Sequence, residues 1–158
     1  MERMIVGKEL LDLPGAATPE EIRGNLRDIA AANRWLGGTS VVLGHLRDML
    51  GGMESVRVLD LATGLADIPV AIVRYARRHG MNVEITAVDN NPTVVELACE
   101  HSSSFPEITI ERRNILDLPY GDASFDFVTC SQTIHHLSNE EVEQVLRSAN
   151  RLAAKGMI

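Results

Sequence analysis

The sequence predicts an α/β protein built on a doubly wound, Rossmann-like parallel sheet, and three observations predict it. Short apolar runs typical of strands alternate with segments of helical periodicity. Two of these strands end in an acid, at Asp60 and at Asp89, directly before a turn. The turn after Asp60 consists of small residues and leads into a helix, and nucleotide-like cofactors bind at such helix N-termini.

Composition bounds the protein to one globular domain. With 158 residues and 45% hydrophobic content, the chain can bury about two-thirds of its unfolded surface. The formal net charge of −7 disfavours a nucleic-acid partner. The basic pairs Arg77-Arg78 and Arg112-Arg113 are interpreted as solvated faces. No apolar run is long enough to cross a bilayer, so we expect no membrane association.

Two helices are predicted before the first strand. Thr18 opens a capping box with Pro19 at the first helical position, and this helix should run to about Asn33. Its apolar stripe is Ile22, Leu26, Ile29 and Ala30. The second helix should span Ser40–Leu50 and stop at Gly51-Gly52.

The first strand, from Val56 to Asp60, precedes the most informative turn of the chain. An acid before the turn repels a pyrophosphate, and Gly64 is the single glycine where a dinucleotide fingerprint needs three. Asp60 suits instead a ligand that carries an ammonium or sulfonium group. The alternative is an ordinary strand-to-helix turn without a ligand.

The second strand, Val83–Val88, ends at Asp89. In a doubly wound sheet this acid lies beside the first turn and can accept both hydroxyls of a ribose. The alternative interpretation makes Asp89 a turn former before Asn91, a helix cap, and Pro92, at the first helical position.

Two further strands complete a pattern of motifs. The third, Ile108–Arg113, leads to Asn114, and the fourth, Ser124–Cys130, precedes the pair His135 and His136. In this order and at these intervals, the four segments resemble the motifs of class I S-adenosylmethionine-dependent methyltransferases. The resemblance runs from about Val56 to the C-terminus. Its Asp-Leu-Ala-Thr-Gly motif is similar to that of quinone-biosynthesis methyltransferases.

The resemblance implies S-adenosyl-L-methionine as cofactor and no metal. Asp60 and the turn from Ala62 to Ala66 would meet the methionine part, and Asp89 the ribose. Asn114 stands where the family usually has Asp, and Ala66 where it has a third glycine. The implied cofactor-binding residues are Asp60, Ala62, Thr63, Gly64, Asp89, Asn90, Asn114, Ile115 and Ser131.

The implied reaction is in-line transfer of the methyl group to a small-molecule acceptor, for which the enzyme mainly aligns the reactants. For a hydroxyl acceptor, His135 or His136 would be the catalytic base. The competing interpretation is a histidine pair that only packs or forms hydrogen bonds. Two other classes stay open: an inactive cofactor-binding module or subunit of a larger assembly, and a nicotinamide-dependent oxidoreductase.

The resemblance also divides the chain into an N-terminal helical extension or lid, residues 1–52, and a cofactor-binding core, residues 53–158. In related enzymes the N-terminal helices cover the acceptor, which implies a lid bearing Trp35. The alternative is Trp35 as a packing anchor of the helical layer.

Three more helices and the chain end complete the prediction. Asp67 should cap a helix that closes at Gly80, and Asn91 one that runs to about Ser102. Ser138 opens a capping box for a helix that stops before Gly156. This last helix should turn five side chains toward the sheet: Val142, Val145, Leu146, Ala149 and Leu152.

We expect the core to be C-terminally incomplete, because the sequence ends where the family has its fifth strand. The fourth strand would then be an open edge, and such an edge recruits another chain. This predicts a homo-oligomer, in its simplest form a dimer.

The remaining polar residues suggest no further site. Cys99 and Cys130 have no metal-ligand spacing and are expected to be reduced, buried thiols of a cytoplasmic protein. Asp126, between two phenylalanines in a strand, is interpreted as structural.

Overall fold

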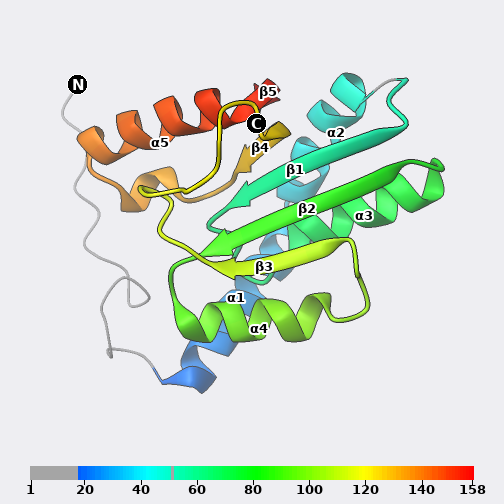
Figure 1. Ribbon diagram of the computed structural model, residues 1–158. Coiled ribbons are helices and arrows are strands. Elements are labelled where there is room, and N and C mark those ends of the chain that lie inside the picture. Colours follow the sequence, from blue (N-terminus) through cyan, green and yellow to red (C-terminus); the bar gives the residue numbers. More distant parts are fainter. Residues whose placement is uncertain (1–17, 51) are drawn as a thin grey trace.

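The computed structural model describes residues 18–50 and 52–158, with a five-stranded sheet at its centre (Figure 1). The strand order is β3-β2-β1-β4-β5, and every neighbouring pair is parallel. The predicted α/β class is therefore confirmed. The elements are α1 (Pro19–Trp35), α2 (Gly38–Leu50), β1 (Ser55–Leu61), α3 (Asp67–Arg78), β2 (Asn82–Asp89), α4 (Pro92–Ser102), β3 (Ile108–Arg112), β4 (Phe125–Cys130), the 3₁₀ turn η2 (Ile134–His136), α5 (Asn139–Leu152) and β5 (Ala153–Met157).

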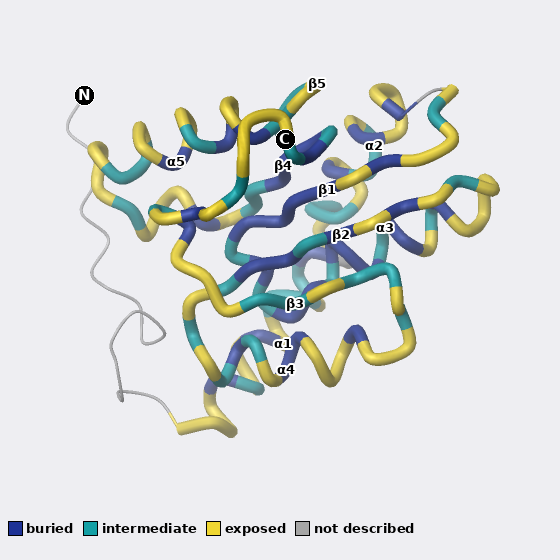
Figure 2. The backbone as a smooth tube through the Cα atoms, viewed as in Figure 1, coloured by how far each residue is buried: buried dark blue, intermediate teal, exposed yellow. Residues whose placement is uncertain are grey.

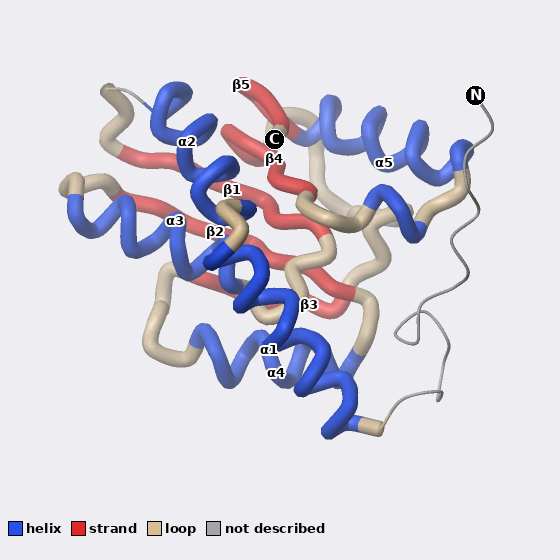
Figure 3. Tube along the Cα trace, turned by 180° about the vertical axis from the view of Figure 1, so that it is seen from behind, coloured by secondary structure: helices blue, strands red, loops and turns tan. Residues whose placement is uncertain are grey.

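The sheet is covered on both faces (Figure 3). Alternate residues of a strand point to opposite faces, so Val58 and Leu59 belong to different core clusters. The first cluster joins β1 and β2 to α2 and α3, and the second joins β1 and β4 to α5. Figure 2 shows the buried stretches concentrated along the central strands. A third cluster packs α1 on α4 through Leu26, Leu65 and Leu97.

Three of the four predicted helix caps are confirmed. Thr18 and Ser138 form complete capping boxes, and the Asn91 side chain accepts a hydrogen bond from the Thr93 N–H at 3.0 Å. The cap predicted at Asp67 is wrong, because Ala66 holds the N-cap position and Asp67 is already helical. The predicted stop at Gly51 lies outside the described residues.

The last helix stops before Gly156, as predicted, but it ends several residues earlier than that glycine suggested. α5 ends at Leu152, and the backbone of Ala153 is extended. The following residues pair with β4 and form the fifth strand that we expected to be missing. The N–H of Ile158 donates to the Val128 carbonyl at 2.9 Å and continues this ladder. Alanine and lysine favour a helix, so here pairing with a central strand overrides local propensity.

The structure corrects two further predictions. β4 is paired on both sides, and the edges of the described sheet are β3 and β5. Along α5, Val145, Ala149 and Leu152 are buried, whereas Leu146 is 39% exposed and does not face the sheet.

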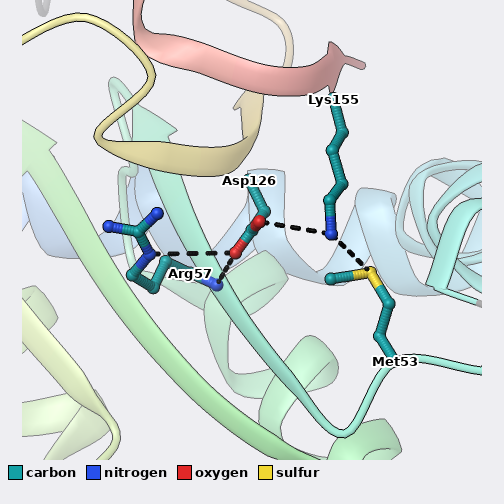
Figure 4. Close-up of polar contacts among 4 residues, drawn as sticks. All are labelled: Met53, Arg57, Asp126 and Lys155. Carbon is teal, nitrogen blue, oxygen red and sulfur yellow. Dashed lines mark hydrogen bonds and ion pairs between the residues drawn. The ribbon is translucent and has the colours of Figure 1, made fainter.

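Asp126 links three strands near the N-terminal end of β4 (Figure 4). Its carboxylate accepts a hydrogen bond from the Arg57 backbone N–H at 2.9 Å. The ammonium of Lys155 lies 3.3 Å from its other oxygen and 3.4 Å from the sulfur of Met53. Partial burial would raise the pKa of Asp126, but the Arg57 N–H and the Lys155 charge together lower it. The predicted structural role agrees with these contacts.

We expect Asp126→Asn to lower the free energy of unfolding by about 1 kcal/mol at pH 7, because a charge-assisted contact to β5 is lost. A carboxyl whose pKa is lowered by folding stabilises the protein above its ordinary pKa of 3.8 and ceases to do so in acid. The difference between variant and parent, measured by urea unfolding, should therefore shrink below pH 4. Asp122→Asn, at a side chain that is 79% exposed, is the control. Equal stability of parent and Asp126→Asn would contradict this account.

Candidate functional site

A cavity of about 370 Å³ opens at the carboxyl ends of β1, β2 and β4. This is the edge of a doubly wound sheet at which ligands bind. Its walls come from the turn after β1, the acid that ends β2, the loop after β4, and α1. Three carboxylates line it, from Asp60, Asp67 and Asp89, and no lysine or arginine is among the lining residues of the described chain.

The turn after β1 brings backbone close to the cavity. Ala62, Gly64 and Ala66 all have positive φ, of 52°, 57° and 58°. This conformation is easy for glycine and strained for alanine. Ala66 therefore adopts the backbone that the glycine of related turns would provide. The Thr63 hydroxyl, which lies between these residues, is buried, and its interaction with the Asp60 carboxylate helps to lower the pKa of that acid.

Asp60 is the most buried of the three acids, at 2% exposure. The hydroxyl of Thr129, on the adjacent strand β4, donates a hydrogen bond to its carboxylate at 2.5 Å. Burial raises the pKa of Asp60 to about 6, and the Thr129 hydrogen bond opposes this rise. The charges of Asp67 and Asp89 raise the pKa further. The ionised form of Asp60 is therefore unfavourable in the folded protein when no cation lies beside it.

Asp89 joins the ends of two strands. One carboxylate oxygen accepts from the Gly64 N–H at 3.2 Å, and the other from the Asn91 N–H at 3.0 Å. Burial raises the pKa of Asp89, while these N–H groups oppose the rise. The structure thus places the acid of β2 against the turn after β1, as the strand-end pattern suggested. Each oxygen retains a lone pair for a further donor.

Asp67 is a site residue that the sequence analysis missed. It was expected to cap a helix, but its carboxylate lines the cavity. Burial raises the pKa of Asp67, and a hydrogen bond from the Asn33 side chain at 3.2 Å opposes that rise. Its position just after the small-residue turn was the available signal, because the first residue of a helix that opens on a ligand site faces the ligand.

Three predicted cofactor residues do not line the cavity. The side chain of Asn114 accepts a hydrogen bond from the Leu116 N–H at 3.0 Å and is exposed. Ile115 is 9% exposed and belongs to the core. Asn90 is exposed, and its carbonyl accepts from Arg112. The loop after β3 still passes close by, because the Arg113 N–H donates to the Asp89 carbonyl at 2.9 Å.

The loop after β4 forms the opposite wall. Ser131, His135 and His136 line the cavity as the sequence suggested, and so does Gln132, the expected neighbour of the cofactor or acceptor beside Ser131. The two imidazole rings lie with centroids 3.9 Å apart on η2, and both residues are exposed. A base at this wall would have access to an acceptor that enters from solvent.

The first helix covers the cavity with residues other than the one expected. Leu26, Ile29 and Asn33 line it. Trp35 does not, and at 78% exposure it is no packing anchor either. Instead it borders a separate cleft among α1, α3 and α4.

The cysteines differ from the expectation of two buried thiols. Cys99 is exposed, and Cys130 is partly buried at the end of β4. Burial raises the pKa of Cys130 to about 11, and the nearby charge of Asp60 adds to the rise. Among residues 18–50 and 52–158 there is no cluster of three or more metal-ligating side chains. Within the same residues, no helix has the length and apolarity that a membrane span requires.

Comparison with known proteins gives consistent matches. The family described as "Methyltransferase domain" matches residues 58–156. Demethylmenaquinone methyltransferase of Staphylococcus aureus is 25% identical over 111 residues, which cover 70% of this chain and 44% of that protein. The enzyme of the same name from Deinococcus radiodurans is 40% identical over 76 residues, 48% of this chain and 30% of that protein. The chain thus spans less than half the length of these curated relatives.

A solved structure matches a larger share of the fold. The crystal structure of a SAM-dependent methyltransferase from Aquifex aeolicus superimposes with a TM-score of 0.62 at 22% identity, covering 87% of this chain and 68% of that one. At this identity the likeness establishes the fold, which is that of class I methyltransferases.

Proposed function

This chain belongs to the methyltransferase domain family, and from that premise we propose that its cavity binds S-adenosyl-L-methionine and serves methyl transfer to a small-molecule acceptor. One observation carries the proposal: three carboxylates line a single cavity without a lysine or arginine among its described walls. Such a wall favours a ligand with positive charge. S-Adenosyl-L-methionine carries a sulfonium and an ammonium group, and when bound it supplies an electrophilic methyl group.

The residues present fit this cofactor. Asp60 and Asp67 offer negative charge on either side of the turn at 62–66. Asp89, fixed by two backbone N–H groups, offers two oxygens to a ribose. The remaining predicted contacts, from Asn90, Asn114 and Ile115 to the ribose and adenine, stay predictions, since these residues do not line the cavity.

Calorimetric titration of the purified chain tests the proposal. S-Adenosylmethionine and S-adenosylhomocysteine should each bind at one site, and NADH should not bind. Asp60→Asn should weaken binding of the methyl donor more than that of its thioether product, because both compounds carry the ammonium group but only the donor carries the sulfonium charge. An absence of binding by both adenosyl compounds, or saturable binding of NADH in their place, would refute the proposal.

The role proposed for the histidine pair is that of a base at the acceptor wall. With a hydroxyl acceptor, His135→Ala and His136→Ala together should lower kcat by about 100-fold, the usual contribution of a general base. Binding of S-adenosylmethionine should change little. His79→Ala, on the far end of α3, is the matched control. Full turnover by the double variant would exclude a base at this wall.

The wider organisation belongs to the same proposal. We take residues 1–52 as a lid and 53–158 as the core, with residues 1–17 outside the described part. A homodimer would form through the free side of β5, and the molecular mass measured by light scattering at high concentration tests this.

A cytoplasmic location stays a prediction. The name of the curated relatives makes a quinone-like ring a reasonable first acceptor to assay.

A further inference from the structure

Asn33 makes two side-chain contacts that cross the candidate site. It lies in the last turn of α1 and is 6% exposed. Its Nδ2 donates to a carboxylate oxygen of Asp67 at 3.2 Å. Its Oδ1 accepts a hydrogen bond from Nε2 of Gln132. All three residues line the cavity.

The two partners of Asn33 lie on different walls. Asp67 begins α3, after the turn that follows β1, whereas Gln132 lies in the loop after β4. In sequence they are 34 and 99 residues from Asn33. The amide of Asn33 therefore forms a bridge from α1 to both walls. We call Asp67, Asn33 and Gln132 the amide bridge.

The geometry of the bridge limits which residue types can form it. An amide can donate to a carboxylate and accept from a second amide at the same time. A carboxylate at position 33 would accept a hydrogen bond from Gln132 but repel Asp67, and an apolar residue would form neither hydrogen bond. Gly38, at the start of α2, closes the space behind the bridge, because a Cβ there would lie 3.0 Å from Oδ1 of Asn33.

We propose that Asn33 is a positioning residue that couples the docking of α1 to the occupancy of the cavity. The inference rests on the proposed function. A cation bound beside Asp67 favours its ionised form, and an ionised acceptor strengthens the hydrogen bond from Asn33. That bond holds the end of α1 and, through Gln132, the loop that carries the histidine pair. Coupling of this kind is reciprocal, so a docked α1 raises the affinity for the cofactor by the same factor.

The test combines cofactor affinity with a reporter on α1. Asn33→Ala should weaken binding of S-adenosylmethionine about tenfold, and Gln132→Ala, at an exposed residue, about threefold. The double variant should bind S-adenosylmethionine no more weakly than Asn33→Ala alone does, because both changes break one bridge. Asn33→Asp should bind the cofactor more weakly than Asn33→Ala does. Asn25→Ala, on the exposed side of the same helix, is the matched control and should bind as the parent does.

Trp35 supplies the reporter. It is the single tryptophan of the chain and lies two residues after Asn33. In the parent, saturating S-adenosylmethionine should raise the fluorescence anisotropy of Trp35, because the end of α1 is held more firmly. In Asn33→Ala and Gln132→Ala, the anisotropy of Trp35 at saturating S-adenosylmethionine should be lower than in the saturated parent. A residue that only stabilises the fold would alter the melting temperature without changing this response to ligand.

The outcomes separate the two proposals. Parent-like affinity in both single variants, or effects that multiply in the double variant, would overturn the coupling and leave the proposed function intact. A parent that binds no S-adenosylmethionine would overturn the proposed function, and the coupling with it. Should Asn33→Ala fail to fold by circular dichroism, Gln132→Ala alone decides, because it leaves α1 unaltered.

Discussion

Replacing Asp89 by Ala should weaken the binding of S-adenosylmethionine by about 100-fold. The carboxylate offers two charge-assisted acceptors to a ribose, and the loss of such a pair costs about 3 kcal/mol. The loss should be equal for S-adenosylhomocysteine, because the two compounds share the ribose and differ at sulfur. Calorimetry with both compounds measures the two affinities.

Asp89→Asn separates the ligand contact from the architecture. Its amide oxygen can still accept from one of the two N–H donors, at Gly64 or Asn91, so the junction of β1 and β2 should persist and affinity should fall only about tenfold. Asp117→Ala, at an exposed acid of the loop after β3, should bind as the parent does. Unchanged affinity in Asp89→Ala would remove this residue from the site.

Asp60→Asn should make the ligand-free protein more stable at pH 7.5, by an upper limit of about 3 kcal/mol. Folding raises the pKa of Asp60 from 3.8 to about 6. At pH 7.5 the folded state must hold the charged carboxylate in a buried place, whereas asparagine imitates its neutral form. As the pH falls through 6 toward 4, the parent takes up the proton and loses this disadvantage, so the two stabilities should converge. Urea unfolding at pH 7.5 and 4.5 measures both differences.

The sign of this effect distinguishes a functional acid from a structural one. The same substitution at Asp126, where folding lowers the pKa, should destabilise at pH 7.5. Asp60→Asn should gain stability and lose affinity for the methyl donor together, as is common where a site is held under strain. A variant that is less stable than the parent at pH 7.5, or a difference that does not vary with pH, would contradict this account.

The sequence was informative where function depends on local order along the chain. Asp60 and Asp89 each end an apolar run, and parallel strands place such ends side by side without any knowledge of packing. Capping boxes at Thr18 and Ser138 likewise depend on residues three apart. These features predicted the sheet, most helix boundaries and one side of the cavity.

The parts that the sequence did not predict depend on distant contacts. Ala153–Met157 has weak strand propensity and becomes a strand because β4 lies beside it. Asn33 gains its place from partners 34 and 99 residues away, which no local spacing indicates. Asp67 was assigned a cap because the left-handed conformation of Ala66 was not foreseen. Trp35 was expected over the acceptor because the N-terminal helices of related enzymes cover it, yet Trp35 borders a different cleft.

The two alanines of the turn after β1 have a consequence for laboratory evolution. Each adopts a backbone that costs about 1–2 kcal/mol more for alanine than for glycine, and a glycine codon is a single base change away. The methyl group of Ala66 is fully buried, so its removal leaves a gap, but that of Ala62 is partly exposed. Selection of a random library for heat tolerance should therefore recover Ala62→Gly early, and because Ala62 lines the cavity, the same change would widen the pocket by one methyl group.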